Sequence, residues 1–184
     1  LLFREAVKGN RRLKVTFINA KPDGRFPAHG PNPLEPGAID QLAAAVRKQK
    51  ADVGIIVDND ADRAFFVDER GRLLTAAETL IFFSQNFRGP AVFDFMIGPL
   101  AHRHFAEHKI KVFTSPVGFY FIKKMMRERR AEFAGEYSGH YYFQEVFGSD
   151  CAIMAAAHFL TRLSQERQAL SQWLGQWPRQ RQLM

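Results

Sequence analysis

The stretch Val53-Gly-Ile-Ile-Val-Asp-Asn-Asp-Ala-Asp-Arg-Ala-Phe-Phe-Val67 places three carboxylates between two short apolar runs. Apolar runs of four or five residues are typical of buried β-strands, so the acidic segment is expected to be a loop between two strands. Carboxylates at alternate positions of one tight loop repel each other unless a cation lies between them. Asp58, Asp60 and Asp62 are therefore candidate metal ligands.

The type of cation follows from the residues around these carboxylates. An EF-hand is the main alternative, because Asp58, Asp60, Asp62 and Glu69 have the spacing of its loop positions one, three, five and twelve. Position six must be a glycine in that motif, and here it is Arg63. Three carboxylates leave room for waters and a phosphate oxygen, which suits octahedral Mg²⁺. A solvated acidic turn needs only one Asp or Asn, so Mg²⁺ is the favoured interpretation.

The pattern of strands and helices indicates an α/β fold. The apolar run 53–57 is typical of a strand buried on both faces of a parallel sheet, with the acidic loop at its C-terminal end, where ligands bind in such sheets. From Thr75 onward the alternation of strand and helix restarts, which predicts a domain boundary near residue 73. Strands are predicted at 13–18, 53–57, 64–67, 91–95, 110–113, 132–133 and 141–143, and helices at 38–48, 75–87, 100–108, 117–130, 151–163 and 170–177.

A second polar segment, Gly135-Glu-Tyr-Ser-Gly-His140, is a candidate binding loop. Glu136, Ser138 and His140 alternate, so in an extended segment their side chains point to one face. A carboxylate, a hydroxyl and an imidazole supply the acceptors and donors that vicinal sugar hydroxyls require. From these residues alone, a polar hairpin tip explains the pattern equally well.

Histidines 102, 104 and 108 invite a metal-site interpretation, which we do not adopt. His104 and His108 share a helix face, but no third ligand accompanies them, so surface histidines are expected.

Composition limits the classes of partner. The net charge of +7 favours anionic partners. Nucleic acid is disfavoured as a partner because no recognition motif accompanies the two basic clusters, at residues 4–14 and 123–130. The apolar runs are too short to cross a membrane. The single cysteine, Cys151, and the lack of a visible signal peptide lead us to expect a cytoplasmic protein.

The acidic loop also carries a family resemblance. It resembles the metal-binding loop of the α-D-phosphohexomutases (phosphomannomutase/phosphoglucomutase), whose usual wording is Asp-Gly-Asp-Ala-Asp-Arg. The segments Asp23–Pro27 and Pro31–Pro36 resemble the family's lead-in to that loop, and Gly135–His140 resembles its sugar-binding loop. Order and spacing agree from about Leu13 to the end of the chain.

The resemblance implies a fold, an activity and roles for these residues. It implies two mixed α/β sandwich domains: residues 1–72 as an incomplete second domain of the family and residues 73–184 as its third, with C-terminal helices. The implied activity is intramolecular phosphoryl transfer that interconverts a hexose 6-phosphate and a 1-phosphate. Mg²⁺ would be held by Asp58, Asp60 and Asp62, and Arg63 would be catalytic. Glu136, Ser138 and His140 would bind the hexose phosphate.

The resemblance is incomplete. The family enzyme has four domains, and no segment here resembles its Thr-Ala-Ser-His-Asn-Pro phosphoserine loop or its C-terminal phosphate-binding loop. We therefore expect the isolated chain to be inactive and to act with the missing mutase domains or a partner chain. The alternative is a non-catalytic module that binds metal or sugar, or that assembles with a partner.

Four positions depart from the family pattern. Asn59 replaces the loop glycine, which asparagine tolerates because it also adopts positive φ. Met96, Pro116 and Phe119 stand where basic residues or histidine are expected to hold the phosphosugar. Each replaces a strong, charge-assisted phosphate contact with an apolar group, so weaker substrate binding is expected.

Overall fold

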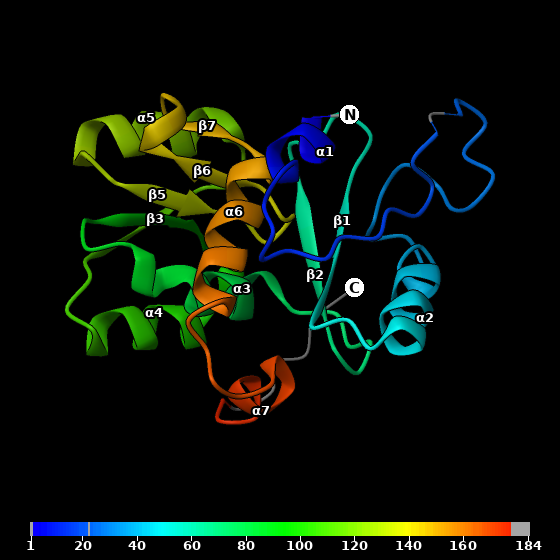
Figure 1. The fold of residues 1–184 in the computed structure, drawn as a ribbon. Helices are drawn as coiled ribbons and strands as arrows, with labels where there is room; N and C mark the ends of the chain where they lie inside the picture. The colour runs from blue at the N-terminus through cyan, green and yellow to red at the C-terminus, as the bar shows by residue number, and fades with distance from the viewer. Residues whose placement is uncertain (1, 22, 178–184) are drawn as a thin grey trace.

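The computed structural model describes residues 2–21 and 23–177, which form a two-stranded and a five-stranded sheet with helices packed against them (Figure 1). The helices are α1 (Leu2–Val7), α2 (Asp40–Gln49), α3 (Ala76–Phe83), α4 (Pro99–Glu107), α5 (Phe119–Arg129), α6 (Ala152–Leu163) and α7 (Leu170–Leu174). The strands are β1 (Val53–Val57), β2 (Ala64–Asp68), β3 (Ala91–Asp94), β4 (Val112–Ser115), β5 (Phe133–Gly135), β6 (Tyr141–Phe143) and β7 (Ser149–Asp150). The predicted α/β class is confirmed.

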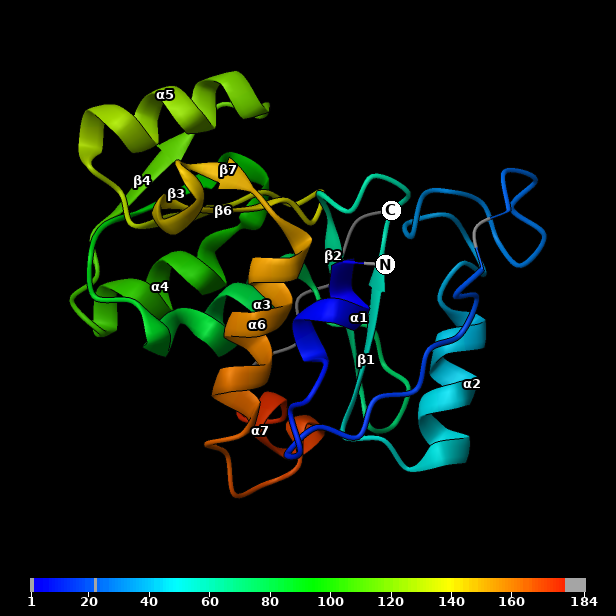
Figure 2. The same ribbon diagram turned by 45° about the horizontal axis from the view of Figure 1, so that its top comes forward.

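The five-stranded sheet has the order β4-β3-β5-β6-β7, with β3 parallel to β4 and β5, and with β6 antiparallel to both β5 and β7. Alternate side chains along each strand point to opposite faces. Val92, Ala134 and Tyr142 pack with α5, whereas Phe93 and Phe133 belong to the larger core on the other face. Figure 2 shows α5 on one side of this sheet and α3 and α4 on the other.

Helix α3 is the central helix of the larger core, and all of its residues are buried. Its start agrees with the sequence. Thr75 accepts a hydrogen bond from the Glu78 backbone N–H at 3.1 Å, and the Glu78 carboxylate accepts one from the Thr75 N–H at 2.8 Å. The helix ends at Phe83, earlier than predicted, and a 3-10 turn, Ser84–Asn86, continues it.

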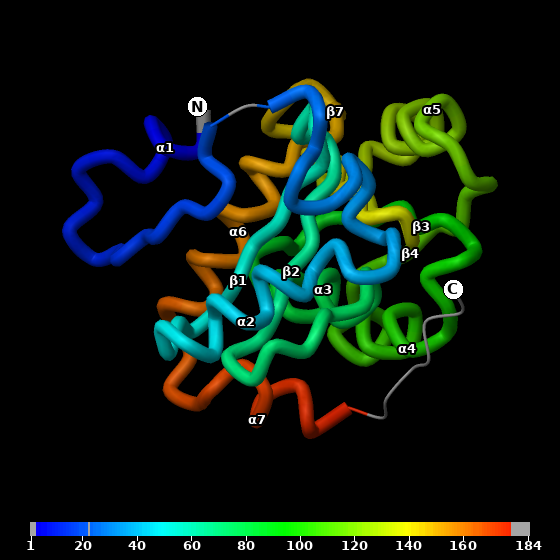
Figure 3. The backbone as a smooth tube through the Cα atoms, turned by 90° about the vertical axis from the view of Figure 1, so that its right-hand side faces the viewer, coloured from blue at the N-terminus to red at the C-terminus, as the bar shows by residue number. Residues whose placement is uncertain are grey.

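Strands β1 and β2 form an antiparallel hairpin, so the expectation of a parallel, doubly buried strand at 53–57 was wrong. β2 is fully buried, whereas most of β1 is only partly buried. β2 is buried on both of its faces. Helix α2 packs against one face of the hairpin through Leu42 and Val46 (Figure 3). The opposite face of β2 meets α6, where the ring centroids of Phe66 and Phe159 stack at 4.0 Å. The acidic loop is the turn of this hairpin and still follows the C-terminal end of β1.

Other expectations need correction. Residues 13–18 form no strand; they are mostly exposed and no described strand pairs with them. The strand predicted at 110–113 lies at Val112–Ser115. His104 is not a surface residue: it is 2% exposed, because its helical spacing from Leu100 and Ala101 places it on the inward face of α4. The boundary near residue 73 stays a prediction, and the larger core includes residues from both sides of it.

Candidate functional site

The acidic loop brings its three aspartates together. Asp58, Asp60 and Asp62 can each offer a carboxylate oxygen, and these atoms lie within 4.8 Å of one another. The Asp62 Oδ1 atom is buried and has no hydrogen-bond partner among the described residues. A positive φ of 62° falls at Ala61, not at Asn59 as expected, and turns the chain so that Asp62 faces back toward Asp58. An all-oxygen donor set with an orphaned carboxylate oxygen fits a hard divalent cation such as Mg²⁺.

The charges in this loop also favour a bound cation. Burial and the neighbouring Asp58 carboxylate raise the pKa of Asp62. Burial also acts to raise the pKa of Asp58, but the hydrogen bonds from Arg63 outweigh it and hold that pKa below its ordinary value. Two close carboxylates with oppositely shifted pKa values repel each other. A bound cation would relieve this repulsion.

Arg63 is fixed at the start of β2 by two different segments. Its Nε donates to Asp58 Oδ2 at 2.6 Å, and its backbone N–H donates to Asp58 Oδ1 at 3.2 Å. A terminal nitrogen of its guanidinium donates to Asn32 Oδ1 at 3.1 Å. Asn32 belongs to the Pro31–Pro36 segment, for which the sequence indicated no role. It orients Arg63, which keeps further N–H groups for a ligand.

The second candidate loop is a tight turn and not the extended segment that was expected. The Gly139 N–H donates to the Glu136 carbonyl at 3.1 Å, and the Glu136 N–H donates to the His140 carbonyl at 3.0 Å. Gly139 has φ +91°, and a Cβ there would lie 2.6 Å from the Phe65 ring. The turn nevertheless brings the predicted side chains together: Ser138 Oγ lies 2.8 Å from His140 Nδ1, and that nitrogen lies 3.3 Å from Glu136 Oε2.

Glu136 is more deeply buried than is expected of a residue that binds a sugar. It is 3% exposed, and its carboxylate accepts hydrogen bonds from the Gly118 N–H at 2.9 Å and the Tyr142 hydroxyl at 2.8 Å. Burial acts to raise its pKa, but the bonds from His140 and Tyr142 lower the pKa below its usual value. In this structure Glu136 ties the turn before α5 to the second loop, while Ser138 and His140 remain partly exposed. Gly118 and Tyr142 were not predicted, and no sequence motif marks them.

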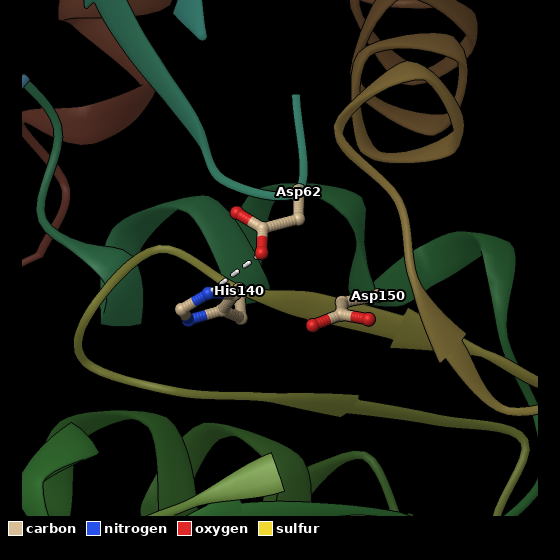
Figure 4. Close-up of side chains that lie close together, drawn as sticks. All are labelled: Asp62, His140 and Asp150. Atoms are coloured by element: carbon tan, nitrogen blue, oxygen red, sulfur yellow. Dashed lines mark ion pairs between the residues drawn. The ribbon is translucent and has the colours of Figure 1, made fainter. Parts of the chain in front are cut away.

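The two loops meet at His140. Its Nε2 lies 3.5 Å from Asp62 Oδ2, and the Ala64 N–H donates to the Gly139 carbonyl at 3.1 Å. Figure 4 shows the Asp62 carboxylate pointing at the imidazole, with Asp150 of β7 beside it. Ligand atoms of Asp62, His140 and Asp150 also lie within 4.8 Å of one another. Burial acts to lower the pKa of His140, but the hydrogen bond to Glu136 and the charge of Asp62 act more strongly in the opposite direction. The pKa of His140 is therefore raised above its ordinary value.

The three apolar residues that depart from the family pattern lie at the same edge of the five-stranded sheet as the second loop. Met96 follows β3, and Pro116 and Phe119 follow β4; all three are exposed, Phe119 by 66%. Asp94 connects this edge to the second loop, since its carboxylate accepts from the Met96 N–H at 2.9 Å and from the Tyr137 N–H at 3.0 Å. The edge therefore presents apolar side chains beside Ser138 and His140.

The fold and these two loops define an α/β protein in which a carboxylate loop faces a histidine-bearing turn. Family models agree. The model "Phosphoglucomutase/phosphomannomutase, alpha/beta/alpha domain II" matches residues 3–71, and the corresponding domain III model matches residues 73–180. The chain belongs to the phosphoglucomutase/phosphomannomutase family, the α-D-phosphohexomutases.

Individual relatives support this assignment. The chain is 35% identical to a phosphomannomutase of Methanocaldococcus jannaschii over 163 residues, which are 86% of this chain and 36% of that protein. It is 34% identical to a phosphoglucomutase of Neisseria gonorrhoeae, over 82% of this chain and 34% of that one. A phosphoglucomutase/phosphomannomutase family protein from Burkholderia thailandensis superimposes with a TM-score of 0.76 at 26% identity, covering 83% of this chain and 35% of its own. The chain thus spans about a third of the length of these relatives.

No helix within the described residues is long and apolar enough to span a membrane.

Proposed function

We propose that this chain forms the metal-loop and sugar-loop portion of a phosphohexomutase that acts on a hexose phosphate such as glucose or mannose phosphate. The observation that supports this most strongly is the contact between the two loops, where His140 Nε2 lies 3.5 Å from Asp62 Oδ2. A cation ligand and a sugar-loop imidazole so close together can act on the same phosphorylated hydroxyl. The names of the relatives support the same class of substrate.

The residues divide the chemistry between them. Asp58, Asp60 and Asp62 would hold Mg²⁺, which supplies charge neutralisation to a transferring phosphoryl group. Arg63, oriented by Asp58 and Asn32, offers its remaining N–H groups to phosphate oxygens. Ser138 and His140 contact sugar hydroxyls. Glu136 either holds His140 in place or exchanges this contact for a hydrogen bond that its carboxylate accepts from a sugar hydroxyl. Phosphoryl transfer depends chiefly on such positioning and charge stabilisation.

We further propose that the 184-residue chain has no mutase turnover by itself. No segment in it resembles a phosphoserine loop, and metal or sugar affinity does not replace a nucleophile. A coupled assay with glucose 1-phosphate or mannose 1-phosphate, primed with the bisphosphate, should give the rate of buffer alone. Turnover that survives repurification would contradict this.

Cation binding is tested by calorimetry with Mg²⁺. We expect a site in the millimolar range in the wild-type chain and its loss in Asp60→Ala. Asp52→Ala is the matched control, because Asp52 is an exposed aspartate at the other end of β1 and should leave binding unchanged. An Asp60→Ala titration equal to that of the wild type would rule out the loop as the cation site.

Sugar binding is tested by NMR titration with glucose 6-phosphate. Amide shifts are expected at residues 136–140, and His140→Ala should weaken binding by about 1–3 kcal/mol, because polar partners lose their hydrogen bonds. His108→Ala, at an exposed histidine directly after α4, is the control.

The exposed Met96 and Phe119 favour a second candidate, a module that retains the fold and no longer holds the phosphosugar. Two results together would favour that module: the wild-type chain shows no amide shifts with glucose 6-phosphate, and the triple variant Met96→Lys, Pro116→Lys, Phe119→His gains binding.

A further inference from the structure

A second polar surface lies on the outer side of α5, at the edge of the sheet opposite the sugar loop. β5 leads into that loop and β6 runs back from it, so the turn that follows β6, residues 144–148, lies at the opposite edge. Helix α5 begins near the sugar loop, where the Gly118 N–H binds Glu136, and its C-terminal end reaches the 144–148 turn. Figures 1 and 2 show the outer side of α5 uncovered by any other described helix.

An open hollow of about 310 Å³ lies between the end of α5 and this turn. Its walls include Lys123, Arg127 and Arg130, with Gln144 and Phe147, and no acidic residue lines it. Among the described residues none of these three cations pairs with a carboxylate; Lys123 reaches only Ser149 Oγ, at 3.4 Å. The negative end of the helix dipole favours basic residues here, but it amounts to about half a charge. The hollow therefore carries a net positive charge that would attract an anion.

Phe147 supplies a flat apolar wall to the hollow. It is 95% exposed and has φ +60°, a conformation that a bulky residue rarely adopts. The backbone holds it there, because the Phe147 N–H donates to the Gln144 carbonyl at 3.1 Å and the Gly148 N–H donates to the Phe143 carbonyl at 3.0 Å. An exposed ring contributes nothing to the core, so packing does not account for its presence in a strained turn.

We propose that this hollow binds a nucleoside phosphate. The phosphate groups contact Lys123, Arg127 and Arg130, and the base stacks on the Phe147 ring, beside the Gln144 amide, which can donate to and accept from a base edge. Basic side chains next to an exposed aromatic ring form the arrangement that binds nucleotides without sequence preference. The same chemistry comes from a free nucleotide or from a nucleotide within a single strand.

A neighbouring hollow extends the surface along α5. It shares Lys123 and Arg127 with the first and adds the exposed rings of Phe119 and Tyr120, but it also contains Glu128. Lys124 lies 4.0 Å from Glu128, so this part of the surface is partly neutralised. The hollow at Phe147 is therefore the primary site, and its neighbour would hold the next nucleotide of a strand.

The test is an amide NMR titration of the 184-residue chain with four probes: ADP, adenosine, inorganic pyrophosphate and a hexamer of deoxyadenylate. ADP is expected to shift amides at residues 123–130 and 144–148 and to leave residues 136–140 unmoved, which separates this site from the proposed sugar site. Pyrophosphate should bind more weakly than ADP, and adenosine should shift little. A hexamer that binds far more tightly than ADP at the same residues assigns the site to a single strand; comparable affinities assign it to free nucleotide.

Variants identify the two halves of the site. Phe147→Ala should weaken ADP binding about tenfold and leave pyrophosphate unchanged, since only the base uses the ring. Arg127→Gln combined with Arg130→Gln should abolish binding of both. Phe26→Ala is the control for the ring, because Phe26 is also an exposed phenylalanine with positive φ, and Arg103→Gln is the control for charge. Absence of shifts with both ADP and the hexamer, or an unchanged ADP affinity in Phe147→Ala, would overturn the proposal.

Discussion

The imidazole of His104 lies in the apolar layer beneath the sheet, where its Nε2 meets Ser84 Oγ at 3.2 Å and its Nδ1 has no partner among the described residues. Burial, with a smaller effect from His108, lowers its pKa from the ordinary 6.5 to about 4. His104 is therefore neutral in the folded protein over a range in which the unfolded chain would protonate it.

This pKa predicts a pH dependence of stability. Between pH 6.5 and 4 the unfolded state binds the proton and the folded state does not, so stability should fall as the pH is lowered through this window. We expect His104 to contribute about 2 kcal/mol to the loss between pH 7 and pH 4.5. Urea unfolding at several pH values measures it. His104→Gln should show a flatter profile, whereas Gln49→Ala, at an exposed residue that does not titrate, should follow the wild type.

At the scale of one element, the turn that carries Ser138 and His140 depends on a single backbone conformation. Gly139 combines φ +91° with a Phe65 ring that lies 2.6 Å from the position a Cβ would occupy. A side chain there is strained by its backbone and also collides with the ring, so the turn must shift and move His140 away from Asp62.

Gly139→Ala is therefore expected to destabilise the protein by about 2 kcal/mol and to change the His140 ring resonances in NMR spectra. Gly24→Ala is the matched control, because Gly24 has open space around it and no positive φ. Equal stability of the two variants would show that the turn accommodates the methyl group and that its geometry does not depend on glycine.

At the scale of the whole molecule, one aromatic cluster joins the acidic-loop hairpin to the five-stranded sheet. Phe159 of α6 stacks on Phe66 of β2 at 4.0 Å and lies 4.5 Å from Phe82 of α3, all three fully buried. The β1–β2 hairpin is thus buried against the core that α3 and α6 share with the five-stranded sheet. This packing also holds the acidic loop next to the loop at residues 136–140.

Phe159→Ala should cost about 3–5 kcal/mol, the usual loss for a large cavity in a core. Tryptophan fluorescence, to which Trp173 and Trp177 both contribute, and hydrogen exchange at residues 53–57 should report the same unfolding transition, because both regions share this core. Phe121→Ala, at a ring that is 46% exposed, is the control and should change stability little. Two separate transitions in the wild type would contradict a shared core.

Local patterns in the sequence determined most of the elements and pointed to the candidate site residues. The apolar runs predicted β1 and β2, and the Thr75 and Glu78 pair predicted the start of α3, because these signals act between near neighbours. The alternating aspartates predicted a carboxylate cluster for the same reason. The family resemblance, and with it the fold class, rested on such local motifs.

Tertiary structure alone decided the rest. The antiparallel pairing of β1 with β2 is the exception, because the connection at residues 58–63 is too short for a parallel crossover. Whether His104 is buried depends on which surfaces α6 and the sheet offer, and these contacts join residues far apart in the chain. The burial of Glu136, the anchoring of Arg63 by Asn32 and the approach of Asp62 to His140 arise in the same way. No short-range pattern encodes them, since each depends on the packing of two separate segments against a common core.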